Sequence, residues 1–496
     1  QQQQQRQQQQ QMTRLFQGSS FSGVSMDQSA DFSWPGVLQH STPNAETLKA
    51  RSVLSELANL EVVQQVQIDK LRQLQFQVLG SPQESAVAGL QQQMAQLNGQ
   101  IQEEQKQLLH LCRSFVLEPA ELSVARQLAQ KLQIQLQHLE ILHLELQQAA
   151  RGEPLGVAML VLESQPIPQV IFKGKVIEDE YTVRLVLGTR MDVRSVSNVK
   201  AALISEEKVW KLAEPLENDS CALDVYNRVG TFSQIKVKVS SRMTPIFLKF
   251  GVQVVTSEAP TPVTVQSHPS FPIIAITNES QWCEAQAKLL INDTFAGQSA
   301  IPWPQFANGL HHHFLKATRQ DAAKPNRTLT PEEFSYIHQK FFRGQAEVTS
   351  QQADEFWRWF GQITQTLRFK RHINFLWFSG LIYGLITKNQ CNMALANQEV
   401  GTFMMRFSES YPGLFAIAYV SEDPADRVKH YLVKPDDTGS QKTLPDFLRD
   451  KPQFQHIYQL DIYTGQLHRY PKDTVFHNFY SKTKRLNSED NGYVLL

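Results

Sequence analysis

The sequence is poor in cysteine, has no net charge and contains no long apolar run, and each shortage excludes a class of protein. Its 496 residues include four cysteines, which lie far apart and form no Cys-x-x-Cys pair: Cys112, Cys221, Cys283 and Cys391. This spacing argues against a zinc site or a disulfide framework and favours a reducing compartment. The 48 basic residues balance 48 acidic ones, so any DNA binding has to come from a local patch. No apolar run reaches membrane-spanning length and no signal peptide is found, so no membrane association is expected.

Sequence signatures of enzymes and of metal sites are also missing. The chain carries no Walker loop, kinase signature, nucleophile elbow or metal-spaced cluster, so we expect no enzymatic activity, cofactor or metal. The triplet His311-His-His313 is the most metal-like feature, but adjacent positions on a helix do not share a face. We therefore do not expect a metal site there.

The length predicts several domains, because single hydrophobic cores stop growing at about 250–300 residues. Residues 1–44 open with a glutamine run and continue through Ser, Gly and Pro. Such a composition buries too little apolar area to order the backbone, so we expect a disordered segment. The chain begins with Gln rather than Met, so we also expect a fragment of a longer protein.

Residues 45–150 carry the spacing of long helices. Apolar residues recur at alternating steps of four and three, which is the heptad seam of a coiled coil, interrupted at Glu104 and Gln135. The seam residues are Leu90, Met94, Leu97, Ile101, Leu108, Leu111 and Phe115, then Ala125, Leu128, Leu132, Leu139, Leu142 and Leu146. Breaks at Gly80-Ser-Pro82 and Glu118-Pro119 predict three antiparallel segments of an elongated helical bundle. Its surface is either a site for protein partners or a structural spacer, and both interpretations remain open.

Residues 151–299 read as short strands divided by turns. The β-branched or aromatic runs are 157–162, 170–172, 181–187, 199–204, 234–240, 246–255 and 273–277. Seven such runs predict an antiparallel sandwich or barrel. Basic residues recur near the strand ends, and loops of this kind suit a phosphate backbone. Solvated lysines on a sheet face are ordinary as well, so charge alone leaves DNA binding open.

Residues 300–372 return to a helical pattern and are expected to form a linker domain. Thr330-Pro-Glu-Glu333 has the signature of a capped helix start. The bulky side chains of Phe356, Trp357, Trp359 and Phe360 predict a wedge of core between two larger domains.

The stretch Gly401-Thr-Phe-Met-Met-Arg-Phe-Ser-Glu-Ser410 carries the strongest functional signal. It places Arg406 among bulky apolar residues and then opens into a polar turn. An arginine in a buried strand is costly unless an anion meets it. The guanidinium fork matches a phosphate, and the hydroxyls of Ser408 and Ser410 add donors. This is the chemistry of a phosphotyrosine pocket, and a salt bridge to a neighbouring acid is the alternative.

The elements around this stretch follow the order of an SH2 domain. A polar helix precedes the Arg406 strand, residues 414–420 and 427–433 read as two further strands, and residues 444–448 read as a second helix. A central antiparallel sheet between two helices is therefore expected for residues 373–483.

The whole order resembles the STAT family, the signal transducers and activators of transcription. The match rests on residues 376–388, on Gly401–Ser410 and on the late Tyr493, with weaker echoes at 163–166 and 274–278. The resemblance covers roughly residues 45–496. It implies a multidomain α+β fold: coiled-coil bundle 45–150, immunoglobulin-like or p53-like β-sandwich 151–299 that binds DNA, helical linker 300–372, SH2 domain 373–483 and tail 484–496.

The resemblance also implies roles for individual residues. The phosphotyrosine-binding set falls on Arg406, Lys388, Ser408, Glu409 and Ser410, and the phosphorylated tail tyrosine falls on Tyr493. DNA-contacting residues fall on Lys200 and Asn278. Arg242 is a third candidate, although the segment Val239-Ser-Ser-Arg242 departs from the family, whose members carry acidic residues there.

The expected function is that of a latent cytoplasmic transcription factor. After a tyrosine kinase acts, two copies would exchange phosphorylated tails between their SH2 domains, enter the nucleus and bind double-stranded DNA. A cytoplasmic SH2 adaptor that does not bind DNA is the alternative. A tail that folds back onto its own SH2 domain is also within reach, because about a dozen residues span up to roughly 40 Å.

Overall fold

The structure is a computed structural model that describes residues 45–205, 214–257, 261–438 and 442–481. The predicted segments 1–44 and 484–496, and with them Tyr493, lie outside the described residues.

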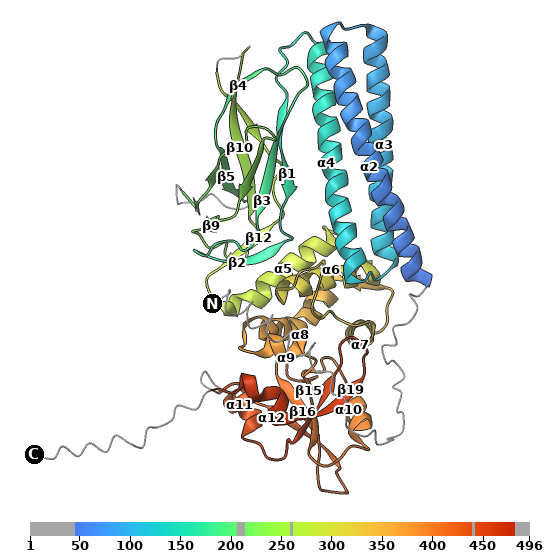
Figure 1. Ribbon diagram of the computed structural model, residues 1–496, viewed down its shortest axis with the longest axis vertical. Coiled ribbons are helices and arrows are strands. Elements are labelled where there is room, and N and C mark those ends of the chain that lie inside the picture. Colours follow the sequence, from blue (N-terminus) through green and yellow to red (C-terminus); the bar gives the residue numbers. More distant parts are fainter. Residues whose placement is uncertain (1–44, 206–213, 258–260, 439–441, 482–496) are drawn as a thin grey trace, which may run out of the picture. The chain divides into compact units, whose positions relative to one another are not determined.

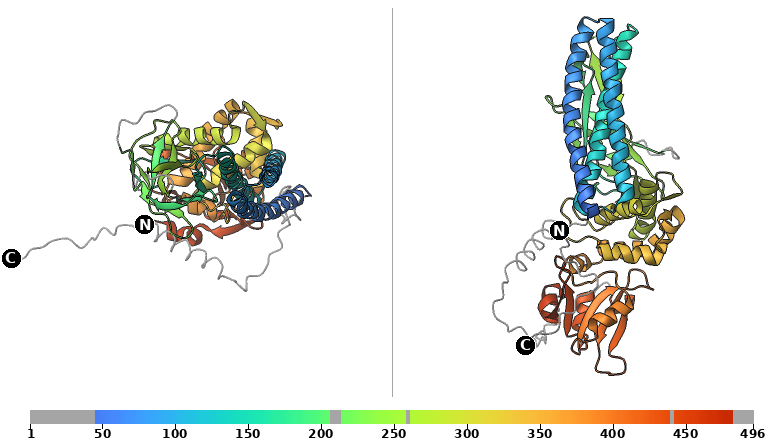
Figure 2. Two further views of the ribbon diagram at one scale, coloured as in Figure 1. Left: turned by 90° about the horizontal axis from the view of Figure 1, so that it is seen from above. Right: turned by 90° about the vertical axis from the view of Figure 1, so that its right-hand side faces the viewer.

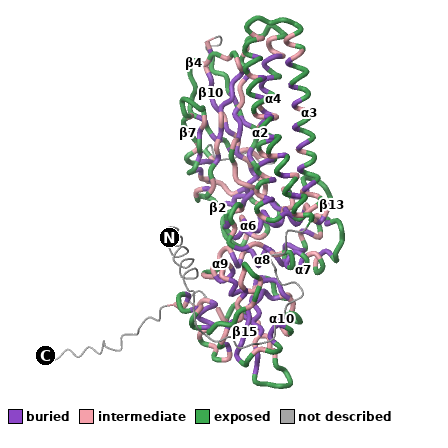
Figure 3. Tube along the Cα trace, turned by 45° about the vertical axis from the view of Figure 1, so that its right-hand side comes forward, coloured by how far each residue is buried: buried purple, intermediate pink, exposed green. Residues whose placement is uncertain are grey.

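Three long helices form the antiparallel bundle that the heptad pattern predicts. They are α2 (Ala45–Gly80), α3 (Glu84–Ser114) and α4 (Pro119–Ala150), and they run side by side in Figures 1 and 2. Their seam leucines are buried, and Figure 3 shows buried stretches alternating with exposed ones along each helix. The two polar interruptions of the seam are buried too. Glu104 accepts a hydrogen bond from the Gln64 side chain, and Gln135 Nε2 donates to the Glu61 carbonyl at 2.8 Å.

Short strands build the β domain. They are β1 (Ala158–Ser164), β2 (Gln169–Phe172), β3 (Tyr181–Leu187), β4 (Val193–Val196), β5 (Val199–Ile204), β6 (Leu216–Glu217), β7 (Ser220–Cys221), β8 (Val229–Phe232), β9 (Lys236–Val237), β10 (Phe247–Thr256), β11 (Val263–Gln266) and β12 (Ile273–Ile276). One sheet has the order β1-β3-β8, and a second has the order β11-β10-β5-β7 with β4 also paired to β10. The alternating residues of β3, β5 and β10 meet in one core that includes Tyr181 and Phe250. The predicted sandwich is confirmed.

Two details of the predicted β region need correction. The run 234–240 contains only the two-residue strand β9. Residues 282–295, counted within the sandwich, form helix α5 (Trp282–Phe295), because Trp282, Ala285 and Leu289 recur at helical spacing and are buried on one face.

The linker region consists of two helix–loop–helix units. Its elements are η1 (Glu279–Gln281), α5, β13 (Ala300–Pro302), α6 (Trp303–Ala317), α7 (Pro331–Phe342), β14 (Glu347–Thr349) and α8 (Ser350–Phe369). Strands β13 and β14 pair antiparallel and join the two loops. Thr330 caps α7 through Glu333, as its sequence predicts. Phe306, Phe342 and Phe356 pack ring against ring in the core.

The histidine triplet belongs to this core. All three side chains on α6 are buried, and His313 lies between Gln286, at 2.7 Å, and Asp293, at 3.0 Å. Arg126 of the bundle also binds Asp293, at 2.6 Å, so the histidine network lies where α4 meets the linker. Burial lowers the pKa of His311 to about 4.

The SH2 domain has a five-stranded sheet of order β17-β16-β15-β18-β19. Its elements are α9 (Ile373–Phe378), α10 (Lys388–Leu395), β15 (Thr402–Phe407), β16 (Phe415–Val420), β17 (Val428–Val433), η2 (Pro435–Asp437), α11 (Leu444–Arg449), β18 (His456–Leu460), β19 (Leu467–Pro471), α12 (Lys472–Phe476) and η3 (His477–Phe479). The predicted central antiparallel strands are confirmed, with Arg406 of β15 opposite Ala416 of β16.

Arg327 joins the linker to the SH2 domain. Its guanidinium lies 3.7 Å from the ring of Trp377 and donates to the carbonyls of Trp377, at 2.8 Å, and Ile382, at 2.7 Å. It also donates to the Tyr383 carbonyl at 2.6 Å. Residues 377–383, whose carbonyls accept these hydrogen bonds, lie against β15, since Tyr383 N donates to Met405 O at 2.7 Å.

Candidate functional site

Arg406 lies in the centre of the SH2 sheet, on a strand whose six residues are all buried. Its side chain is only 6% exposed. Nη1 donates to the Phe407 carbonyl at 3.1 Å and lies 3.9 Å from Glu409 Oε2, while Nε is buried and has no hydrogen-bond partner among the residues that the structure describes. A buried cationic donor without a close acceptor is costly, and an anion that enters the site would satisfy it.

The turn after β15 presents the other predicted residues of the pocket. Ser408 is buried, its N–H donates to the Leu414 carbonyl at 2.8 Å, and its hydroxyl accepts from Tyr411 N at 3.2 Å. Glu409 is half-buried and Ser410 is exposed at the tip. Gly413 closes the turn with φ of +73°, a conformation that favours glycine.

Lys388 enters the site from the start of helix α10. Thr387 caps this helix, and Lys388 N donates to Glu409 Oε2 at 3.0 Å. The side chain of Lys388 is exposed, and the helix N-terminus adds positive potential. The structure thus brings Arg406, Lys388, Ser408 and Glu409 together, with Ser410 at the rim.

His430 belongs to the same pocket and is not among the predicted residues. It lies on β17, where Nε2 is 2.7 Å from Asn392 Oδ1, and Nδ1 is buried with no hydrogen-bond partner in residues 45–205, 214–257, 261–438 and 442–481. Its pKa is lowered to about 4 by burial and by the charges of Arg406 and Lys388. No short motif marks this histidine, because its place depends on the pairing of three strands.

The three predicted DNA-contacting residues are exposed, and two of them lie near one end of strand β12. The turn at Arg242 is fixed there by Ser241 N, which donates to the Ala275 carbonyl at 3.0 Å, and Asn278 follows β12 by two residues. Arg242 has φ of +49°. Lys200 lies elsewhere, on β5 opposite Gly251 of β10.

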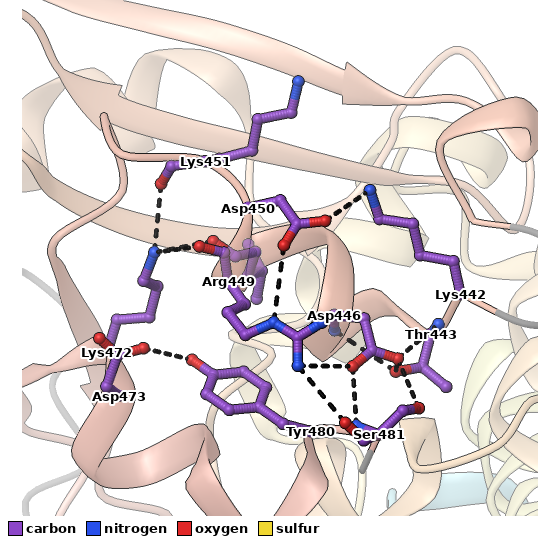
Figure 4. Close-up of polar contacts among 11 residues, drawn as sticks. Lys442, Thr443, Asp446, Arg449, Asp450, Lys451, Lys472, Asp473, Tyr480 and Ser481 are labelled. Carbon is purple, nitrogen blue, oxygen red and sulfur yellow. Dashed lines mark hydrogen bonds and ion pairs between the residues drawn. The ribbon is translucent and has the colours of Figure 1, made fainter. Parts of the chain in front are cut away.

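Ser481 belongs to a polar network beside helix α11 (Figure 4). Ser481 donates to Asp446 through both its N–H and its hydroxyl, each at 2.7 Å. The buried Lys472 Nζ donates to the carbonyl of Leu448, at 2.8 Å, and to that of Lys451, at 3.1 Å. The last described residue is therefore held against α11.

Four stretches of the chain match known families. Residues 51–154 match "Dictyostelium STAT, coiled coil", 158–276 match "STATa Immunoglobulin-like domain", 278–370 match "EF-hand fold domain" and 377–462 match "SH2 domain". The signal transducer and activator of transcription A of Dictyostelium discoideum is 39% identical over 404 residues, which are 79% of this chain and 57% of that protein. The signal transducer and activator of transcription B of Dictyostelium discoideum is 34% identical over 523 residues, and the match covers 96% of this chain and 45% of that protein.

The chain is similar to STAT proteins over most of its length, and these matches support a place in the STAT family. It spans about half the length of the two STAT relatives that it matches. A solved chain titled "Inactive choanoflagellate E3 ubiquitin ligase Cbl TKB" is 16% identical, covers 40% of this chain and 55% of that chain, and has a TM-score of 0.18, which is too low to carry an argument.

Two further observations concern ions and lipid. The loop at residues 296–302 of the EF-hand-like region contains no Asp or Glu, and the loop at 343–349 contains only Glu347, whereas an EF-hand loop binds calcium through several carboxylates. Within the described residues, no helix is both long and apolar enough to cross a lipid bilayer.

Proposed function

We propose that this STAT protein dimerises when the phosphorylated Tyr493 of each copy binds the Arg406 pocket of the other, and that the dimer binds double-stranded DNA. The observation that carries the proposal is the buried guanidinium of Arg406, whose Nε has no hydrogen-bond partner within the described part of the chain. Phosphotyrosine brings about two negative charges and three acceptor oxygens, so it suits this pocket far better than the neutral phenol. The proposed phosphotyrosine-binding residues are Arg406, Lys388, Ser408, Glu409 and Ser410; of these, Glu409 would contribute through the backbone of the turn, because its carboxylate is itself an acceptor.

Reciprocal exchange of tails would produce a symmetric pair. Each bound tail raises the effective concentration of the other, so two weak contacts support one stable dimer. A symmetric dimer in turn suits a roughly palindromic DNA site. In this proposal a tyrosine kinase acts on the cytoplasmic chain and the dimer moves to the nucleus.

The proposed domain division keeps a bundle at 45–150, an immunoglobulin-like domain from 151, a linker to 372, an SH2 domain at 373–483 and a tail at 484–496. We place the start of the linker at Glu279, where the helices begin. We propose Lys200, Arg242 and Asn278 as DNA contacts, since all three are exposed. Protein partners on the bundle remain a proposal, supported by Val62, Val63 and Val66 of α2, which are at least half exposed.

Sizing by light scattering tests the dimer. The kinase-treated chain is expected to be a dimer, whereas Arg406→Ala and Tyr493→Phe are expected to stay monomeric. Arg358→Ala is the matched control, because this arginine is exposed on α8 and pairs with Asp354 of the same helix. Phosphorylation-dependent dimers of Arg406→Ala would refute the proposed contact, and a phosphorylated monomer would indicate a tail bound in cis.

Selection of bound duplexes from a random pool separates the transcription factor from the adaptor. The phosphorylated dimer is expected to enrich a palindromic site and to lose affinity steeply as salt rises. An adaptor would show neither property. Lys200→Ala and Asn278→Ala then test the two contacts separately, because loss of a phosphate contact weakens all sequences and loss of a base contact relaxes specificity.

A further inference from the structure

The carboxylate of Glu409 lies between the SH2 domain and the linker. Oε2 faces the pocket, where it accepts from Lys388 N at 3.0 Å and lies 3.9 Å from Arg406 Nη1. Oε1 faces helix α7 of the linker, where it lies 3.4 Å from Tyr336 OH and 3.5 Å from Lys340 Nζ. One carboxylate thus serves two cations that come from different domains.

Lys340 is held firmly in this position. Its Nζ donates to Tyr336 OH at 2.8 Å, and it lies between 5.2 and 5.6 Å from the rings of Tyr336, Phe341 and Trp359. Cation–π contacts with three rings restrict the flexible stem. The pKa of Tyr336 is raised by burial and by Glu409, so the phenol stays a neutral donor.

This arrangement matters for an anion in the pocket. The Glu409 carboxylate lies 3.9 Å from Arg406 Nη1, so a phosphate that binds the same guanidinium would lie close to it. The two negative charges would repel each other. Lys340 and Tyr336 neutralise and retain the carboxylate from the linker side. Without them, Glu409 keeps its hydrogen bond from Lys388 N but loses the cation on the linker side, so its charge acts on Arg406 and competes with the phosphate.

We propose that Lys340 is a positioning residue of the phosphotyrosine site, which holds Glu409 on the linker side and leaves Arg406 to the phosphate. Phosphotyrosine affinity then depends on how α7 is docked on the SH2 domain, and the linker regulates the dimer contact. The inference rests on the proposed function, because it takes Arg406 as the phosphate ligand.

The test measures binding of a fluorescent phosphotyrosine peptide, with the sequence of residues 488–496, to the full chain carrying Tyr493→Phe. That background removes competition from the chain's own tail. Lys340→Met is expected to weaken binding about fivefold, the effect of losing one partly exposed ion pair. Lys340→Arg keeps the charge and is expected to bind within about twofold of the starting chain. Lys288→Met is the matched control, because it removes an exposed ion pair of α5 with Glu284.

The decisive arm is a double-mutant cycle with Glu409→Gln. If Lys340 acts by holding the Glu409 charge, Lys340→Met has almost no effect once that charge is gone. The penalty of Lys340→Met is also expected to shrink as salt rises. An equal loss in both backgrounds would show that Lys340 only supports the fold, and no loss in either would also overturn the inference.

The failure of this inference can be told apart from the failure of the proposed function. If Arg406→Ala binds the peptide as well as the starting chain, the phosphotyrosine pocket itself is wrong. If Arg406→Ala abolishes binding while Lys340→Met leaves it unchanged, only the role of the linker is wrong.

Discussion

Arg327 offers the sharpest test of how the linker supports the SH2 domain. Its guanidinium is buried, donates to three carbonyls at 2.6–2.8 Å and stacks on Trp377. Arg327→Met keeps a stem of similar length but removes this donor from all three carbonyls, of which only that of Trp377 keeps another described donor, Gly380 N at 3.0 Å. Each orphaned buried acceptor costs about 1–3 kcal/mol before relaxation, so the carbonyls of Ile382 and Tyr383 together cost about 2–6 kcal/mol. We therefore expect Arg327→Met to lower the local stability of residues 376–383 by about 4 kcal/mol.

Hydrogen exchange is the appropriate assay, because a multidomain chain does not unfold in a single two-state step. The amide of Tyr383 reports directly, since it donates to Met405 O beside Arg406. Arg358→Met, which removes an exposed guanidinium, is expected to change protection by less than about 0.5 kcal/mol. A change below about 1 kcal/mol in Arg327→Met would refute the reasoning, because water would then have replaced the guanidinium without penalty.

Two further predictions follow from other buried positions. Burial lowers the pKa of His311 to about 4, while the unfolded value is about 6.5, so the unfolded chain binds more protons between these values and stability falls as pH drops through this window. Hydrogen exchange of the α6 amides at several pH values, corrected for the intrinsic exchange rates, is expected to show a loss of about 3 kcal/mol by pH 4 from this residue, and His311→Asn should flatten the dependence. Gly380 has φ of +70°, and a Cβ there would lie 1.8 Å from the Leu460 carbonyl oxygen, so Gly380→Ala should lower the melting temperature of the SH2 domain. Gly99→Ala, at an open helical position, is its control and should raise stability by about 0.5–1 kcal/mol; an equal response of both variants would contradict the steric argument.

The features that depend on a long sequence repeat or on a short motif could be predicted from the sequence. The bundle follows from the seam around Leu97 and Leu132, because a repeat sustained over many turns has few structural alternatives. The buried Arg406 follows from its apolar neighbours, and its need for an anion follows from the charge. The cap at Thr330 follows from four residues of local sequence.

The remaining features depend on tertiary pairing that no local pattern records. Strand β4 is almost wholly exposed, so it lacks the alternation that marks a half-buried strand. The contacts of Glu409 with Tyr336 and Lys340 join residues about seventy positions apart, and they exist only when α7 packs on the SH2 domain. Helix α5 has helical spacing at Trp282, Ala285 and Leu289, but this spacing does not show where the β-sandwich ends and the linker begins.

The buried polar pairs of the bundle determine how its helices are aligned lengthwise. Leucine seams alone tolerate a slip of one heptad, about 10 Å along the axis, because leucine then meets leucine again. Such a slip would take Glu104 away from Gln64 and Gln135 away from Glu61, and it would leave a carboxylate among aliphatic side chains. Loss of one partner from a buried charged pair costs several kcal/mol, so the shifted alignments are disfavoured. The helices accordingly have one longitudinal register, and the spacing of any partner surface along them is fixed with it.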